Sequence, residues 1–282
     1  MLSLKNSKRI ILILLSLIVV TLGYAKYNNM SLKDLGFKIL NTIKNMKGST
    51  VNINKLTKVH SPSVTHDDWT ALLDKHVTVN GQVNYKGFIQ DSAALEKYLR
   101  KLSTHPPGKN WSSAETMAYW INAYNAFTVK LIIDHYPVVS IKDIKDGLPI
   151  ITSPWDIKFF KIGNIDCNLN AIEHQILRVE FDDPRIHFAI NCASFSCPKL
   201  RNEAFTPSDL ENQLDDQAKD FVSDPSKNII SDTESKLSSI FDWFKSDFEK
   251  QMPLLDYIQQ YNQALNKSNK VEFIDYNWTL NE

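Results

Sequence analysis

The sequence predicts an α+β fold: a single compact domain of helices packed on a small, mostly antiparallel sheet. Two observations lead to this prediction. Segments with helical periodicity are interrupted by hairpin-like segments, without the regular strand–helix–strand order of parallel sheets. In addition, 43% of the 282 residues are hydrophobic, which provides enough apolar material for one sizeable core.

The beginning of the chain differs in charge from the rest. Residues 1–60 carry ten Lys or Arg side chains and one acidic side chain, a formal charge of +9. The remaining residues carry 22 basic and 31 acidic side chains, a formal charge of −9. The net charge of zero argues against a nucleic-acid binder, which usually has a strong basic excess. We therefore expect a basic leader followed by an acidic domain.

The leader has the features of an export signal. An apolar run over residues 10–22 follows three basic residues, which predicts a signal peptide or an N-terminal membrane anchor over residues 1–25. Residues 26–65 contain a basic amphipathic segment and a linker; the segment either lies on the membrane surface or forms a solvated spacer helix. We expect an exported protein, periplasmic or on the cell surface, attached to the membrane through residues 1–47.

The first half of the predicted domain, 66–282, contains both hairpins. Asn80-Gly81 between two β-type runs predicts a hairpin over 77–85. Four apolar residues at helical spacing predict a helix over 92–102, and a capping box at Ser112 starts a long helix that ends by Tyr136. Gly163-Asn164 predicts a second hairpin over 157–169.

The second half begins with a short helix, which Asn170 and Glu173 cap and which ends near Arg178. Alternating apolar residues over 185–191 predict a strand. A helix start at 206–209, two helical stretches at 239–248 and 254–265, and a strand-like run at 271–276 complete the domain.

Two groups of polar side chains lie where helical periodicity predicts burial. Asn122 and Asn125 share one face of an apolar and aromatic helix that also carries Trp120 and Tyr124. The two amides either satisfy nearby backbone groups or line a site as donors to a substrate or a catalytic base. Glu173-His174 forms the second group, and helix capping explains Glu173 without a functional role.

A third group follows the predicted strand over 185–191. Alternation places His187 and Asn191 on one strand face, and Cys192 and Cys197 follow in a loop of small residues. Three interpretations compete for this group. The two cysteines form a structural disulfide, Cys192 is a nucleophile that a histidine activates, or His187 and the two cysteines bind a metal.

A series of motifs in one order is similar to the domain-of-unknown-function family 547, which occurs in bacterial envelope proteins and in plants. The similar stretches lie at 119–126, 135–137, 153–155, 172–178, 183–194, 196–198, 241–244 and 276–281. The resemblance spans about residues 66–282 and singles out the same three polar groups. It implies no established activity, and it leaves Cys167 outside the pattern.

A weaker resemblance links the domain to papain-like and transglutaminase-like thiol enzymes. That resemblance implies a nucleophilic cysteine at the start of a helix. The predicted helix from Ser112 to Tyr136 carries Asn122 and Asn125 instead of a cysteine. Fold analogy alone does not assign a function.

The first functional hypothesis is a Cys/His-dependent hydrolase or acyltransferase that acts on a peptide or another acyl substrate in the cell envelope. Cys192 is the expected nucleophile. His187 or His174 is the base, and Glu173 or Asn191 orients it. Residues expected to contact the substrate are Asn122, Asn125, Trp120 and Tyr124.

The second hypothesis is a non-catalytic envelope module for binding or scaffolding, in which Cys192 and Cys197 form a disulfide. Under both hypotheses we expect no metal and no cofactor. The expected partner is a small-molecule, peptide or envelope-polymer ligand. The enzyme hypothesis further predicts that the three polar groups converge in one pocket.

Overall fold

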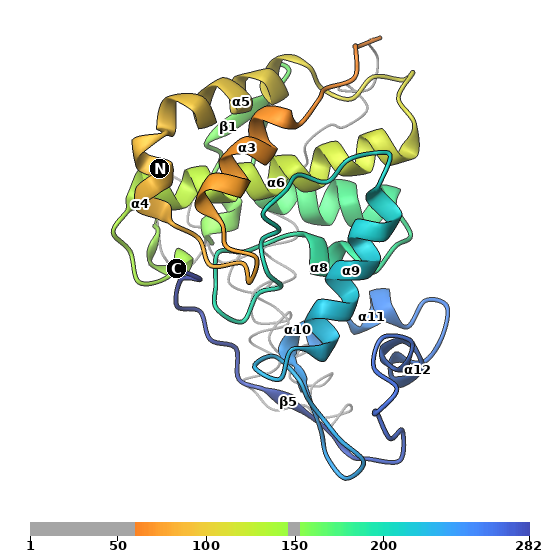
Figure 1. Ribbon diagram of the computed structural model, residues 1–282. Helices are drawn as coiled ribbons and strands as arrows, with labels where there is room; N and C mark the ends of the chain where they lie inside the picture. The colour runs from red at the N-terminus through yellow and green to blue at the C-terminus, as the bar shows by residue number, and fades with distance from the viewer. Residues whose placement is uncertain (1–59, 146–152) are drawn as a thin grey trace, which may run out of the picture. The chain divides into compact units, whose positions relative to one another are not determined.

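The computed structural model describes residues 60–145 and 153–282. Helices predominate, and the strands are short (Figure 1). The helices are α3 (Asp67–His76), α4 (Tyr85–Gln90), α5 (Ser92–Thr104), α6 (Ser113–His135), the 3₁₀ turns η2 (Ile141–Asp143) and η3 (Pro154–Asp156), the π-helix η4 (Ala171–Leu177), α7 (Arg178–Glu180), α8 (Ile186–Ala189), α9 (Leu210–Ser223), α10 (Ser239–Trp243), α11 (Lys245–Phe248) and α12 (Leu254–Gln259). The strands are β1 (Phe160–Ile162), β2 (Ile165–Cys167), β3 (Ile229–Ile230), β4 (Ser235–Ser238) and β5 (Val271–Ile274).

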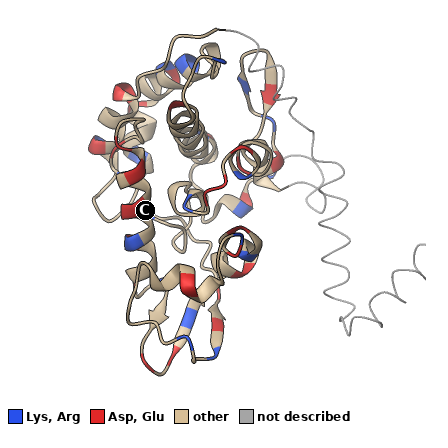
Figure 2. Ribbon diagram, turned by 90° about the vertical axis from the view of Figure 1, so that its right-hand side faces the viewer, with Lys and Arg blue, Asp and Glu red and all other residues tan. Residues whose placement is uncertain are grey.

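The long helix α6 is buried around most of its circumference. Its N-terminus has the predicted capping box, in which Ser112 and Glu115 bond each other's backbone N–H groups. The helix ends at His135, before Pro137, as the sequence predicts. Seen end-on in Figure 2, α6 carries almost no charge, whereas the helices around it carry both signs. A helix that is apolar on all sides needs partners on all sides, and α6 is accordingly the centre of the larger hydrophobic core.

Both predicted hairpins are present, although they are shorter than the sequence suggests. Gly81 adopts a φ of +80° at the first turn, but a single bridge, Val77 to Val83, replaces the predicted strands. Helix α4 begins two residues later. At the second turn, β1 and β2 pair antiparallel with Ile162 opposite Ile165, and Gly163 has a φ of +58°. The α+β prediction is confirmed.

A second hydrophobic cluster lies toward the C-terminus, where α9 to α12 surround Phe188 and Phe241. The three-stranded sheet beside it has the order β3-β4-β5, with β3 antiparallel and β5 parallel to β4. The strand-like run predicted at 271–276 forms β5 (Figure 1).

The prediction of a strand over 185–191 is wrong. Ile186–Ala189 form the one-turn helix α8, in which the Ile190 N–H donates to the Ile186 carbonyl. The Asp183 carboxylate accepts a hydrogen bond from the Arg185 N–H, and Pro184 opens the turn, an arrangement that starts helices. His187 and Asn191 therefore do not share a strand face.

The predicted cap at Asn170 and Glu173 is also wrong. Asn170 has helical dihedral angles and caps nothing; its amide donates to Asp156 instead. The Asn168 side chain accepts from the Ala171 N–H and thus caps the turn two residues earlier than predicted. Glu173 therefore does not cap this helix, contrary to the prediction from the sequence.

The predicted signal or anchor over 1–25 and the amphipathic segment after it lie outside the described residues. Within 60–145 and 153–282, none of the helices combines the length and the apolar character that crossing a membrane requires.

Candidate active site

A pocket of about 220 Å³ collects side chains from segments far apart in the sequence. Four of the predicted catalytic residues line it, namely Glu173, His174, His187 and Cys192. Tyr124, a predicted substrate contact, lines it as well. An aromatic wall, which we define as Trp155, Trp243, Tyr276 and Trp278, encloses much of the remainder.

Cys192 is partly exposed at this pocket and receives several hydrogen bonds. Its Sγ lies 3.0 Å from the Ser194 hydroxyl and 3.3 Å from the Tyr276 hydroxyl. Burial raises the pKa of the Cys192 thiol. The hydrogen bonds with Cys197, Ser194 and Tyr276 together lower this pKa by more than burial raises it, so the net shift is downward. Donors that stabilise a thiolate are what a nucleophilic cysteine needs.

Cys197 has the opposite environment. It is buried, its Sγ lies 2.6 Å from that of Cys192, and it accepts a hydrogen bond from the Cys192 N–H at 2.8 Å. Burial and the adjacent Cys192 raise the pKa of the Cys197 thiol well above its ordinary value. All three cysteines are free thiols, and Cys192 is the one that the structure favours as a thiolate.

Asn191 shapes the loop and does not line the pocket. Its side chain accepts a hydrogen bond from the Ala193 N–H and donates one to the Pro198 carbonyl. Ala193 has a φ of +60°, a left-handed conformation that is uncommon for a residue with a side chain. The Asn191 amide thereby fixes the turn that presents Cys192 and does not orient a histidine.

His187 is held by a carboxylate that the sequence does not reveal. Its Nε2 lies 2.8 Å from Asp247 Oδ2, and its ring stacks on Phe244 with centroids 3.9 Å apart. Its Nδ1 has no hydrogen-bond partner within the described part of the chain. Burial lowers the pKa of His187, and the hydrogen bond to Asp247 offsets this only in part, so the imidazole is neutral near pH 7 and able to accept a proton.

Arg178 completes this network. Its Nε and one terminal nitrogen donate to the two oxygens of Asp247 at 2.6 and 3.1 Å. Burial raises the pKa of Asp247, but hydrogen bonds from His187 and Arg178 outweigh it and hold that pKa well below the usual range. Asp247 is therefore an ionised partner that fixes the His187 ring.

Glu173 lies on the π-helix η4 and points to the pocket. Its side chain is 9% exposed; Oε2 accepts a hydrogen bond from Tyr124 at 3.3 Å, and Oε1 lies 4.0 Å from His174 Nδ1. π-Helical turns are rare and often occur at functional sites. His174 is exposed at the pocket edge, where its Nδ1 lies 3.0 Å from an Arg178 nitrogen.

Asn122 and Asn125 do not join this pocket. Asn122 donates to the Phe205 carbonyl and accepts from the Phe205 N–H, at 2.8 and 3.0 Å. Asn125 donates to the Ala189 carbonyl and accepts from the Asn191 N–H. Trp120 is 2% exposed and packs edge-on against Tyr119 in the core. For these three residues the structure supports the purely structural interpretation.

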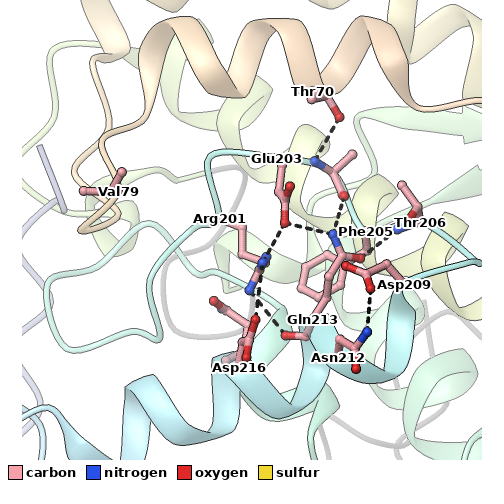
Figure 3. Close-up of polar contacts among 12 residues, drawn as sticks. Thr70, Val79, Arg201, Glu203, Phe205, Thr206, Asp209, Asn212, Gln213 and Asp216 are labelled. Atoms are coloured by element: carbon pink, nitrogen blue, oxygen red, sulfur yellow. Dashed lines mark hydrogen bonds and ion pairs between the residues drawn. The ribbon is translucent and has the colours of Figure 1, made fainter.

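Figure 3 shows the segment that Asn122 anchors. The Thr70 hydroxyl accepts a hydrogen bond from the N–H of residue 204, and the Gln213 side chain accepts one from the Thr206 N–H. Arg201 and Glu203 form an ion pair beside them. The Asn122 amide is one of several side chains that hold this irregular segment against α6 and α9.

The metal interpretation finds no support in the arrangement of side chains. Among residues 60–145 and 153–282, no group of three or more His, Cys, Asp or Glu side chains could hold a metal ion. His187 instead directs Nε2 at Asp247.

Asp247 and the aromatic wall are not among the site residues that the sequence predicts. Nothing in the spacing around Asp247 points to His187, sixty residues earlier. The wall did leave a signal, because Trp243, Tyr276 and Trp278 fall within two of the motifs near the C-terminus. Their partial exposure in one cluster becomes visible only in the fold.

Comparison with known proteins identifies one family. Residues 108–222 match the family described as Protein of unknown function, DUF547. The matched range contains Cys192, His187 and Glu173, and it ends before Asp247 and most of the aromatic wall. No curated protein and no solved structure matches the chain.

Proposed function

We propose that this member of the family of unknown function 547 is an exported, membrane-attached thiol enzyme that hydrolyses or transfers an acyl group. Cys192 is the nucleophile, His187 the general base, and Asp247 the group that orients His187. The basic and apolar pattern predicted as a leader over residues 1–47 supports a location in the cell envelope.

One observation carries the proposal: a partly exposed thiol that receives hydrogen bonds lines the same pocket as a neutral histidine with a carboxylate partner. A thiol, a base and a group that orients the base are the parts that nucleophilic catalysis requires. Structural disulfides and core histidines do not need this combination.

The reaction follows from these parts. His187 accepts the Cys192 proton, and the thiolate attacks the substrate carbonyl carbon. The bond to the leaving group breaks, the leaving group takes the proton from His187, and a thioester remains on Cys192. Water then releases the acyl group as an acid, or an amine or alcohol takes it as an amide or ester, and the thiol is restored.

A second function is supported by one distance. The sulfur atoms of Cys192 and Cys197 lie 2.6 Å apart, so a small movement suffices for a disulfide, whose S–S bond is about 2.0 Å long. In an oxidising compartment such a disulfide leaves a binding module without a nucleophile.

The reactivity of Cys192 distinguishes the two functions. With the full chain under reducing conditions, we expect iodoacetamide to modify Cys192 at least about tenfold faster than Cys167 near neutral pH. Burial raises the pKa of the Cys167 thiol to about 11, which makes it an internal reference. We expect His187→Gln to slow the modification of Cys192 about tenfold, because the base that accepts its proton is lost.

The control is His105→Gln, a change at a histidine outside the pocket, which should leave the rate unchanged. Mass mapping of disulfides in the protein isolated without reductant decides between the thiol enzyme and the binding module. A Cys192–Cys197 disulfide that resists glutathione would overturn the nucleophile model and support the binding module.

A further inference from the structure

Glu173 is a buried carboxylate without a cationic partner in the described part of the chain. Its polar neighbours are the Tyr124 hydroxyl and His174 Nδ1. Arg178 donates a hydrogen bond to His174 Nδ1, so this nitrogen does not donate to Glu173, which lies 4.0 Å away. Arg178 itself is bound to Asp247. Buried charges are normally paired, so a cationic group of a ligand would be a suitable partner for this carboxylate.

The aromatic wall beside Glu173 favours the same sign of charge. Tyr276 and Trp278 have centroids 4.5 Å apart, Trp243 stacks on Trp278 at 5.8 Å, and Trp155 meets Trp278 edge-on. The faces of aromatic rings carry partial negative charge and attract cations. Lys142 already lies over this wall, with its Nζ 4.3 Å from the centre of the Trp278 ring.

We propose that the pocket selects acyl substrates that carry an ammonium group near the reacting carbonyl. This inference rests on the proposed function and names its substrate class. The Glu173 carboxylate neutralises the ammonium, and the aromatic wall encloses its hydrocarbon surroundings. A volume of about 220 Å³ suits a group the size of an amino-acid side chain. An anionic group in the same place meets the repulsion of Glu173.

Thiosulfonate reagents of similar size test this selection directly at Cys192. An ethyl methanethiosulfonate is attacked at sulfur by the thiolate, which forms a mixed disulfide and releases methanesulfinate. We compare reagents that end in trimethylammonium, hydroxyl and sulfonate, and we measure each rate at Cys192 by mass spectrometry. Each rate is divided by the rate of the same reagent with free cysteine.

For the wild-type chain, we expect the trimethylammonium reagent to react at least about tenfold faster than the sulfonate reagent, with the neutral reagent between them. Glu173→Gln should remove most of this preference, measured as the ratio of the trimethylammonium rate to the sulfonate rate at Cys192. Glu180→Gln is the matched control, because Glu180 is exposed and lies outside the pocket, and it should keep the full preference.

Trp243→Leu provides a second arm that does not depend on the fold tolerating a change at Glu173. Trp243 is 48% exposed, and its replacement should reduce the ratio of the trimethylammonium rate to the hydroxyl rate about threefold. Equal rates for all three reagents at a reactive Cys192 would overturn the inference and leave the proposed function standing. A Cys192 that reacts with none of them would overturn the proposed function itself.

Discussion

Buried polar side chains in this domain differ in what satisfies them. Asn122 bonds both polar groups of Phe205, which lies 83 residues away in the sequence, and Asn125 bonds main-chain groups at 189 and 191. Glu173 accepts one hydrogen bond and faces a pocket. The first kind of residue contributes to stability, whereas the second kind is available to a ligand.

This difference gives a prediction for Asn122. In Asn122→Ala, the buried N–H and carbonyl of Phe205 lose their partner, so we expect the free energy of unfolding to fall by about 2–4 kcal/mol. Urea titration followed by circular dichroism measures this loss. Asn212→Ala is the control: Asn212 is exposed and bonds only the side chain of Asp209 in Figure 3, so the change should be within about 0.5 kcal/mol. A loss of less than 1 kcal/mol at Asn122 would contradict the anchoring role.

At the scale of single residues, the sequence predicted the polar groups better than their roles. Glu173, His174, His187 and Cys192 were singled out from their positions, and the fold brings them to one pocket. Periodicity predicted that Asn122 and Asn125 are buried, but it could not tell a ligand from the backbone of a distant segment. That distinction depends on tertiary contacts that a single sequence does not contain.

Secondary-structure elements were predictable where local signals agreed. The predictions of the α6 capping box and of the turn at Gly163 were correct, because a few adjacent residues determine each feature. The segment 185–191 carried conflicting signals, since apolar residues at 186, 188 and 190 fit a strand while Asp183-Pro184 favours a helical turn. In the fold the helical turn forms, because one turn suffices to bury Phe188 and to direct His187 at Asp247.

Three short helices depend on a single carboxylate. Asp247 on α11 bonds His187 on α8 and Arg178 on α7. Helices of three or four residues have little stability of their own, so tertiary contacts of this kind must hold them. The position of His187 therefore depends on an ionised Asp247.

This dependence predicts how stability changes with acid. The pKa of Asp247 is lower in the folded state than in the unfolded state, so the stabilisation is complete above the unfolded value of about 3.9 and is lost as the pH falls below it. Asp247→Asn should lower the free energy of unfolding by about 2 kcal/mol at pH 7. Its difference from the wild type should shrink between pH 4 and pH 2.

Urea titrations at several pH values measure this difference. Asp242→Asn serves as the control, because Asp242 is exposed on the neighbouring α10 and should leave the curve unchanged. If the difference in unfolding free energy between Asp247→Asn and the wild type is the same at pH 7 and at pH 2, Asp247 does not act through its charge.

At the scale of the whole domain, the last residues of the chain complete the site. Backbone groups at 279, 280 and 281 bond the loops at 195, 139 and 83, respectively. These bonds hold Tyr276 and Trp278 at the pocket that Cys192 lines, although both residues lie more than eighty positions later in the sequence. The pocket thus draws on residues from both hydrophobic cores, and a sequence pattern confined to one segment could not reveal it.

The opposite charges of the leader and the domain, +9 and −9, bear on where this pocket works. If the leader directs export, Cys192 lies outside the cytoplasmic membrane, within reach of a reagent that cannot cross it. We expect the trimethylammonium thiosulfonate to modify Cys192 of the full chain in spheroplasts, in which only the cytoplasmic membrane is intact. Its positive charge suits a pocket that contains Glu173.

Two controls make the result decisive. A chain without residues 1–25 should react only after lysis, because its leader is absent. Treatment with a phosphine reductant that stays outside the membrane separates a hidden pocket from an oxidised one: modification of Cys192 that needs the reductant indicates a Cys192–Cys197 disulfide in an exported protein. If the full chain reacts only after lysis, with or without the reductant, the domain is cytoplasmic. The envelope assignment is then wrong, although the thiol chemistry of the pocket is unaffected.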